Sequence, residues 1–219
     1  MCGRFSITTT WEELEDRFAV DIPQDLYKPR YNAAPSQNML VIPEETPHQA
    51  DFYRWGLIPH WAKDAKIGNR LINARAETIV EKPSFKSSFE KHRCLVLADS
   101  FYEWDKKSAK HVPYRIILQG GKPFAFAGIY DYWRSVKGEL IKSFAIITTQ
   151  SNDLLSKIHD RMPVILSKED EARWLDSALE LKNAKELLKE YPPNEMEMYP
   201  VSTLVNNPKN DVADVLKSA

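Results

Sequence analysis

Apolar and polar residues follow one another in patterns that predict strands in the middle of the chain and helices on either side. Five runs are rich in β-branched and aromatic residues, a composition that fits a pleated, half-buried surface. These runs cover residues 39–42, 94–104, 112–118, 123–133 and 143–149. Another short apolar run, at 162–166, predicts one more strand.

Helical patterns flank these runs. Thr10 and Glu13 have the spacing of a capping box, in which each side chain accepts a backbone N–H of the first helical turn. This box predicts a helix from about Trp11 to about Phe18. Further helical patterns cover residues 151–158, 168–176 and 177–191.

The order of these elements favours an α+β fold whose strands form a mainly antiparallel, open or barrel-like sheet. No repeat, low-complexity tract or long linker calls for a boundary, so we expect one domain over residues 1–219. No apolar run approaches the roughly 20 residues that span a bilayer. The first residues do not have the pattern of a signal peptide, and we expect a cytoplasmic protein without a membrane segment.

Charge is distributed unevenly along the chain. A net charge of −1 argues against a protein that coats nucleic acid through an overall basic excess. Residues 60–122 nevertheless contain 13 Lys and Arg against 7 Asp and Glu, whereas residues 167–219 contain 7 against 11. The basic segment fits either a DNA-binding groove or an ordinary solvated surface.

The two cysteines, Cys2 and Cys94, are too few for a disulfide framework and cannot complete a four-ligand zinc site alone. Removal of Met1 would leave an amine and a thiol together on Cys2. The amine, with an ordinary pKa of about 8, is partly neutral at physiological pH and can attack an aldehyde. The thiol can then close a five-membered thiazolidine ring on the imine. Position alone does not distinguish this aldehyde trap from a cysteine without function.

The start Met-Cys-Gly is also that of the N-terminal-nucleophile amidotransferases, which use the thiol against glutamine. Those enzymes need Gly-rich and Arg-Gly segments to hold glutamine and to build an oxyanion hole. This chain has 7 Gly, and no such segment follows Cys2. An amidotransferase remains the alternative enzyme.

Several separated motifs resemble those of one family. MCGRF at the start, INARAET (72–78), ADSFYEW (98–104) and IHDRMPVIL (158–166) are similar to motifs of the SOS-response-associated peptidase (SRAP) family. Further similar stretches are PRYNAAPSQ (29–37), RWGLIPHWAKD (54–64), EKPSFKSSFEKHRC (81–94), PFAFAGIYDYW (123–133) and VSTLVNNPKND (201–211). The resemblance covers essentially the whole chain in order, which makes it specific although each motif alone is weak.

The resemblance implies a protein that senses abasic sites in single-stranded DNA and traps them as a thiazolidine crosslink, which protects the lesion during the DNA damage response. By motif position, Cys2 is the nucleophile and Asn73 is the amide that orients its α-amine. Glu103 is expected to shuttle protons, and His159 to polarise the sugar oxygen as the ring opens. The same group of residues is expected to remove Met1 autocatalytically.

Each of these side chains also has an ordinary explanation. Asn73 could cap a turn, Glu103 could be a surface carboxylate, and His159 could face the end of a helix dipole. Their joint occurrence at the family's motif positions favours the catalytic interpretation, because an amide, an acid and an imidazole are what aldehyde condensation needs around an aminothiol.

The resemblance also implies a DNA interface that reads no base identity, because stacking on aromatic rings tolerates any sequence. The residues expected to contact phosphates, bases or the lesion are Arg4, Pro35, Trp61, Arg75, Trp104, Thr148 and Arg161. Trp55, Trp133 and Trp174 are expected to be structural. No metal or organic cofactor is implied, and we expect a monomer whose partner is single-stranded DNA.

The chain departs from the family's pattern at Leu97 and Ser100, where Pro and Gly are common, and at Ala33, where a larger apolar residue is usual. Gly tolerates a positive φ and Ser does not, so Ser100 is expected to alter the turn that presents Glu103. Three hypotheses remain at this point: a covalent abasic-site trap, an amidotransferase, and a non-covalent single-strand-binding module.

Overall fold

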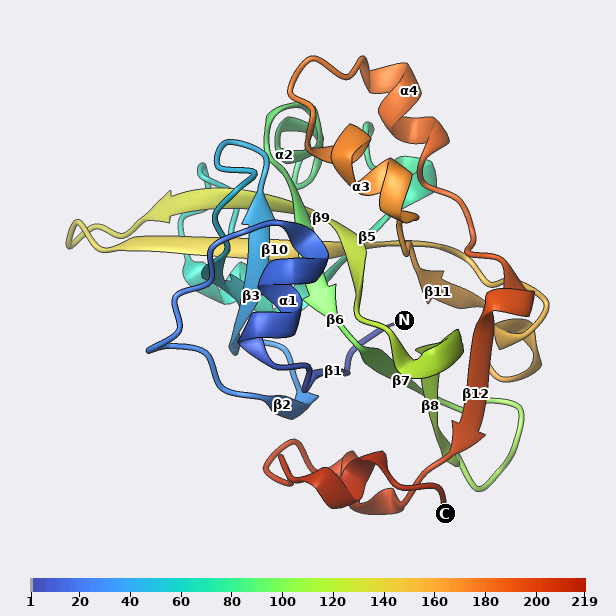
Figure 1. Cartoon of the computed structure of the whole chain (residues 1–219). Coiled ribbons are helices and arrows are strands. Elements are labelled where there is room, and N and C mark those ends of the chain that lie inside the picture. The colour runs from blue at the N-terminus through green and yellow to red at the C-terminus, as the bar shows by residue number, and fades with distance from the viewer. Residues whose placement is uncertain (1) are drawn as a thin grey trace.

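The computed structural model, which describes residues 2–219, is built around a closed ring of five strands (Figure 1). Around the ring, β10 pairs with β4, β4 with β3, β3 with β6, β6 with β9, and β9 again with β10. Within the ring only the pairing of β10 with β4 is parallel. The bounds are β3 Asn38–Pro43, β4 Asp51–Trp55, β6 Arg93–Ala98, β9 Phe124–Arg134 and β10 Leu140–Gln150.

A second, fully antiparallel sheet has the order β12, β8, β7, β1, β2. Its strands are β1 Phe5–Ile7, β2 Arg30–Ala33, β7 Ser100–Trp104, β8 Pro113–Leu118 and β12 Met196–Pro200. The prediction of an α+β fold with a mainly antiparallel, barrel-like core is confirmed. The single strand predicted over 94–104 is wrong, because the chain leaves the barrel after β6 and enters the second sheet as β7.

The break between β6 and β7 is caused by Asp99. Its buried carboxylate accepts hydrogen bonds from the Ser6 hydroxyl and from the backbone and hydroxyl groups of Thr8 and Thr9. A buried carboxylate needs this many donors to offset its lost hydration. These long-range hydrogen bonds to Asp99 therefore outweigh continued strand pairing at this position.

Two three-residue strands flank the end of β10 and bring site residues to the barrel. β5 (Asn73–Arg75) runs parallel to β10, with Asn73 opposite Ile146 and Arg75 opposite Thr148. β11 (Arg161–Pro163) runs antiparallel, with Arg161 opposite Gln150. The strand predicted at 162–166 is thus present in shortened form.

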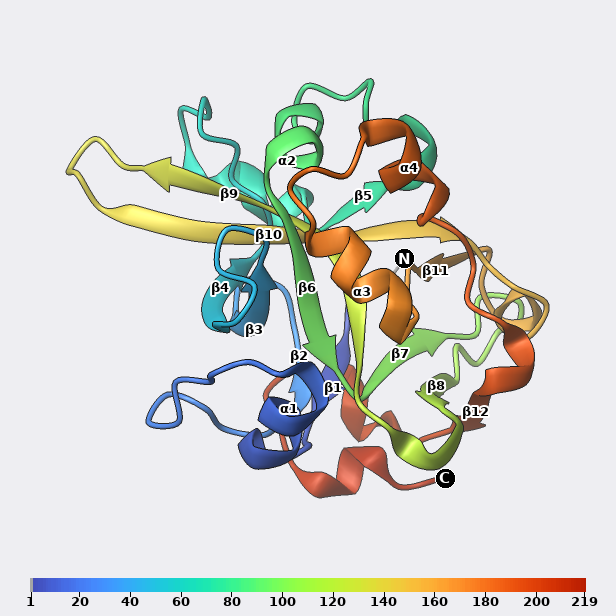
Figure 2. The same cartoon turned by 45° about the horizontal axis from the view of Figure 1, so that its top comes forward.

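The predicted helix at Trp11–Phe18 is confirmed as α1, including the reciprocal capping box of Thr10 and Glu13. α3 (Lys168–Leu175) also agrees with its prediction, and with α2 (Lys86–Lys91) it covers β6 from outside (Figure 2). The helix predicted over 177–191 is reduced to α4 (Leu181–Glu186), because Asp176 closes a turn with Leu179 first.

The helix predicted over 151–158 is wrong. Only a 3-10 turn forms there, at Leu155–Lys157. The Asn152 side chain accepts from the backbone N–H groups of Leu154 and Leu155, which holds the chain in a tight turn instead of a helix.

Aromatic rings fill the barrel and fix the start of the chain. Phe5 of β1 packs against Trp55 at a centroid distance of 5.0 Å and against Phe126 at 5.8 Å. Burying a Phe side chain stabilises the fold by about 1.5–3 kcal/mol. Cys2 lies three residues ahead of this anchor, so its position is fixed by the core. The prediction that Trp55, Trp133 and Trp174 are structural agrees with their burial.

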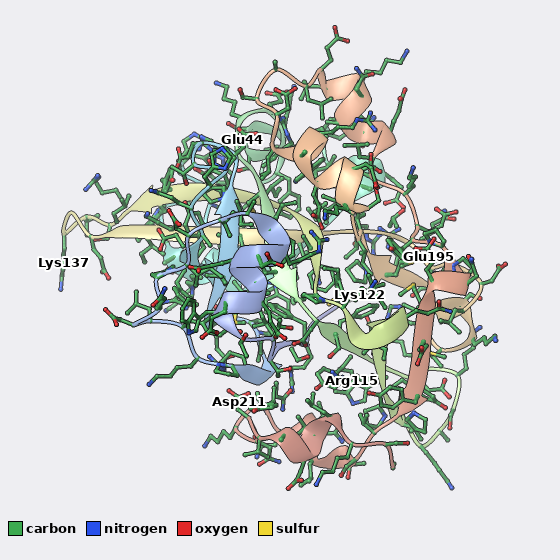
Figure 3. The ribbon with its side chains drawn as sticks, viewed as in Figure 1. Glu44, Arg115, Lys122, Lys137, Glu195 and Asp211 are labelled. Carbon is green, nitrogen blue, oxygen red and sulfur yellow. The ribbon has the colours of Figure 1, made fainter. Side chains whose placement is uncertain are left out.

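The hairpin of β9 and β10 projects from the body of the molecule, with Lys137 at its tip (Figures 1 and 3). No helix among residues 2–219 combines the length and apolar character needed to cross a bilayer.

Candidate active site

The four side chains predicted to be catalytic come from four segments and meet in the interior. Cys2 precedes β1, Asn73 begins β5, Glu103 lies in β7, and His159 lies two residues before β11. Asn73 donates to the Cys2 carbonyl oxygen at 2.7 Å, and the His159 Nε2 atom lies 3.8 Å from Glu103 Oε2. Residues up to 157 positions apart in sequence are thus gathered around the start of β1.

Cys2 is completely buried, and its thiol Sγ lies 3.9 Å from the carbonyl oxygen of Arg4. Burial, reinforced by the negative charge of Glu103, raises the pKa of the Cys2 thiol far above its ordinary value. The thiol is therefore protonated at neutral pH and needs a proton acceptor before it can react. Glu103 is close enough to influence it electrostatically.

Asn73 is placed by the pairing of β5 with β10. Its Nδ2 binds the Cys2 carbonyl, and its buried Oδ1 has no hydrogen-bond partner among residues 2–219. A buried acceptor without a partner is costly. The amide thus keeps one acceptor available next to the backbone of Cys2.

Glu103 is buried in β7, opposite Tyr114 of β8. Burial raises the pKa of the Glu103 carboxyl to about 7. At neutral pH the protonated and ionised forms are similarly populated, which suits a group that gives and takes protons. This burial excludes the simpler explanation of Glu103 as a surface carboxylate.

His159 is also buried, and burial lowers the pKa of its imidazole to about 4, so the ring is neutral near pH 7. The backbone N–H of Arg161 donates to Nδ1 at 2.9 Å, while the Arg161 carbonyl lies 3.1 Å from the same nitrogen. The Asp160 Oδ1 atom also lies 3.1 Å from Nδ1. Nδ1 thus has one donor and two acceptors within reach, and each tautomer of the ring satisfies part of this set. The other ring nitrogen, Nε2, faces Glu103.

Six of the seven residues predicted for the DNA interface are exposed or partly exposed. Arg75 is exposed, and the Trp61 side chain is 50% exposed. The others are partly exposed: Arg4, Pro35, Trp104 and Arg161. These positions leave a cation and aromatic faces available to a strand at the surface.

Arg4 and Trp104 are held by the C-terminal segment. Arg4 NH1 donates to Asn32 Oδ1 at 2.7 Å and to the Val205 carbonyl at 2.6 Å, and its guanidinium lies 5.7 Å from the Trp104 ring centre. The Trp104 indole N–H donates to Asn206 Oδ1 at 2.7 Å. Much of the donor capacity of Arg4 is thus used inside the protein.

Asn32 and Asn206 received no role from the sequence. The buried Asn32 amide donates to the carbonyls of Val205, Asn207 and Asn210, which clamps the C-terminal segment onto β2. Asp211 reinforces this contact from the same side, between β2 and the final turns of the chain (Figure 3). The three asparagines of NNPKND (206–211) indicate a polar turn that could form such contacts. The sequence does not show that the partners are Asn32 and Trp104.

Arg161 and Thr148 form a unit at the end of β10. Arg161 donates to the carbonyl of Thr148 at 2.6 Å, and its two terminal nitrogens also bind Glu77. Thr148 is fully buried, as Cys2 is, and its expected approach to the DNA or the lesion stays a prediction. Its observed contribution is to hold Arg161.

The expectation that Ser100 strains a turn is wrong. Ser100 lies in extended strand β7 and is not among the described residues with positive φ. Its hydroxyl contacts the Ser6 hydroxyl and accepts from Arg115 Nε at 2.9 Å. Ser100 therefore joins the polar network around Asp99. Leu97 and Ala33 are buried core residues.

Within residues 2–219, no three His, Cys, Asp or Glu side chains are arranged to hold a metal ion.

Comparison with known proteins extends the resemblance. The family model described as SOS response associated peptidase (SRAP) matches residues 1–208. The chain is 45% identical over 227 residues to a Bacillus subtilis protein named abasic site processing protein YoqW, with all of both chains covered. It is 33% identical over 225 residues to the abasic site processing protein YedK of Escherichia coli, with 99% of each chain covered.

A solved structure has the same fold. The crystal structure of a Bacteroides thetaiotaomicron protein superposes with a TM-score of 0.92 at 29% identity, over the full length of both chains. Family match, relatives and fold agree: the chain belongs to the SOS response associated peptidase family.

Proposed function

We propose that this protein senses abasic sites in single-stranded DNA and links them covalently to Cys2 as a thiazolidine once Met1 has been removed. The names of the relatives YoqW and YedK support abasic-site processing. The observation that carries the covalent step is the convergence of an amide, an acid and a neutral imidazole on buried Cys2.

The first bond forms between the α-amine of Cys2 and the aldehyde carbon of the ring-opened abasic sugar. Water leaves and an imine remains. Glu103, with a carboxyl pKa of about 7, takes a proton from the attacking amine and gives one to the departing hydroxyl. The Oδ1 acceptor of Asn73 orients the amine, because it lies beside the Cys2 backbone without another partner among the described residues.

The second bond forms between the Cys2 sulfur and the imine carbon. The thiol proton passes to Glu103 and then to the imine nitrogen, which closes the ring without a change in oxidation state.

The aldehyde arises before these bonds form, when the closed sugar opens. The hemiacetal hydroxyl gives its proton to Glu103, the bond between the anomeric carbon and the ring oxygen breaks, and Glu103 returns the proton to that oxygen. We assign the imidazole proton to Nε2, where His159 donates a hydrogen bond to the ring oxygen, and the Arg161 N–H that donates to Nδ1 supports this tautomer. A neutral imidazole polarises the ring oxygen without adding a buried charge.

Removal of Met1 belongs to the same proposal. The same four residues, Cys2, Asn73, Glu103 and His159, hydrolyse the peptide bond between Met1 and Cys2. This step consumes one water molecule and frees the α-amine of Cys2. The word peptidase in the family's description supports this step. An acylated amine cannot form an imine, so processing must precede crosslinking.

For the DNA interface we propose phosphate contacts by Arg75, Arg161 and Arg4, base stacking on Trp61 and Trp104, and a wedge at Pro35. The exposure of Arg75 and Trp61 supports this assignment.

We further propose that the protein acts as a cytoplasmic monomer that joins the nucleoid when it engages DNA. Light scattering of the purified protein, and fluorescence microscopy of a C-terminal fusion before and after DNA damage, test these two points.

Denaturing electrophoresis with an oligonucleotide containing one abasic site tests the function. A heat-stable band of reduced mobility that requires the abasic site is expected. Release of ammonia from glutamine without such a band would instead indicate an amidotransferase. A shift on native gels alone would indicate a non-covalent single-strand-binding module.

A further inference from the structure

Arg161, proposed to bind a DNA phosphate, is engaged by a carboxylate of the same chain. Its NH1 lies 2.5 Å from Glu77 Oε1, and its NH2 lies 3.0 Å from Glu77 Oε2. Two parallel N–H donors on two oxygens form the bidentate arrangement that a guanidinium also makes with phosphate. Glu77 therefore occupies the place of a phosphate on Arg161.

The two partners differ in how firmly they are held. The Arg161 side chain is 12% exposed, and its NH2 also binds the Thr148 carbonyl at 2.6 Å and the Thr148 hydroxyl at 3.3 Å. The Glu77 side chain is 43% exposed and lies in a 3-10 turn at Ala76–Thr78. The guanidinium is fixed from behind by β10, and the carboxylate is the partner free to move into solvent.

The charges around Glu77 favour its ionised form. Hydrogen bonding from Arg161 lowers the pKa of the Glu77 carboxyl, and the positive charge of Arg75 acts in the same direction. The Glu77 carboxylate is thus negative at physiological pH. It lies near Arg75 and Arg161, the two arginines proposed to contact the DNA strand. A phosphate reaching Arg161 must replace it or repel it.

We propose that Glu77 is a specificity-determining residue of the DNA interface, whose carboxylate competes with backbone phosphate for Arg161. This inference rests on the proposed function. Undamaged strands then bind weakly and leave readily, whereas an abasic strand is retained by its covalent bond to Cys2. Selectivity for the lesion thereby comes from two properties together: non-covalent binding is weak, and the abasic strand is captured covalently before it dissociates.

A supporting role for Glu77 would change the affinity for single-stranded DNA in the opposite direction. If Glu77 served to orient Arg161 toward phosphate, removal of the carboxylate would weaken binding. Competition predicts that removal strengthens it. The direction of one affinity change therefore separates the two.

The test measures fluorescence anisotropy of an undamaged single-stranded oligonucleotide with wild type, Glu77→Gln and Glu77→Ala. Both variants are expected to bind about two- to fivefold more tightly, the upper part of the range for one partly exposed charged pair. Glu81→Gln is the matched control, because it removes the same charge from an exposed carboxylate four residues away. The control is expected to change affinity by less than about twofold.

A third variant tests whether the affinity gain of Glu77→Gln depends on Arg161. In an Arg161→Ala background, Glu77→Gln is expected to lose most of its effect, because the contested guanidinium is gone. Unchanged or weaker binding by Glu77→Gln overturns the inference, as does an equal gain in Glu81→Gln. Failure of the wild type to crosslink abasic DNA would instead refute the proposed function, and the affinities on undamaged DNA would still decide the role of Glu77.

Discussion

Burial gives the ionisable side chains of the site their chemical character. Glu103 and His159 lie in the same dry environment, yet desolvation moves them in opposite directions, raising the pKa of the carboxyl to about 7 and lowering that of the imidazole to about 4. Both groups are therefore mostly uncharged slightly below neutral pH. An acid that readily changes state beside a neutral hydrogen-bond donor is suited to condensation of an amine with an aldehyde.

Glu103→Gln is expected to slow crosslinking about 100-fold to 10,000-fold at saturating abasic DNA, because it removes a proton carrier. The wild-type rate should increase with pH through about 7 as the carboxyl ionises, and this inflection should be absent in the variant. Single-turnover crosslinking between pH 5.5 and 8.5, an interval of about 1.5 units on either side of the pKa, measures both. A variant that reacts at the wild-type saturated rate would remove Glu103 from the mechanism.

The same substitution should change the pH dependence of stability. The folded-state pKa of Glu103, about 7, lies above the ordinary value, so the folded state binds the proton more tightly than the unfolded state. The resulting stabilisation is fully present below about pH 4.3 and is lost as pH rises through 7. Relative to wild type, Glu103→Gln should gain on the order of 1–3 kcal/mol between pH 5 and pH 8.

Urea unfolding of both proteins at these two pH values checks the prediction. Comparison at equal pH removes the contribution of His159, whose lowered pKa acts in the opposite direction. A stability difference that is the same at both pH values would contradict the assigned burial of the Glu103 charge.

At the scale of elements, short segments place the site. β5 and β11 have three residues each, and they fix Asn73 and the turn after His159 against opposite sides of β10. The C-terminal segment acts similarly on β7, where the Asn206 side chain holds the Trp104 indole. These elements depend on the barrel for their shape, because three residues cannot form a stable strand alone.

Asn206→Ala is expected to weaken binding to undamaged single-stranded DNA about two- to fivefold, because an unanchored Trp104 ring loses part of a stacking contribution of about 1–3 kcal/mol. Asn207→Ala is the matched control. It is also exposed, and its side chain accepts from the backbone N–H of Lys209 and not from Trp104. Anisotropy titrations compare the two; equal losses would exclude a specific role for Asn206.

At the scale of the whole molecule, the sequence predicted the class of fold better than its connections. The apolar runs at 39–42, 123–133 and 143–149 correspond to barrel strands whose burial is nearly continuous over these residues. The run at 112–118 corresponds to β8, in which buried and half-buried residues alternate irregularly. β1, β2, β4, β5 and β12 were not predicted, since three to five residues show too little periodicity to recognise. The break at Asp99 depends on donors from residues 6–9, which local patterns cannot reveal.

In the candidate site, too, the sequence identified the residues but not the contacts between them. Cys2, Asn73, Glu103 and His159 were identified from motifs, and the structure brings them together. Their pKa shifts, the contact of Asn206 with Trp104 and the pairing of Glu77 with Arg161 arise from long-range packing. No sequence spacing encodes which carboxylate will reach which arginine.

The intact mass of the product formed with an abasic oligonucleotide tests the aminothiol mechanism most directly. One adduct is expected, which is stable to heating and to denaturant. Its mass should equal that of the protein without Met1 plus the oligonucleotide less one water. Cys2→Ala should form no stable adduct, and Cys2→Ser at most a reversible imine. A stable adduct on Cys2→Ala, or a wild-type adduct that still carries Met1, would contradict the aminothiol mechanism.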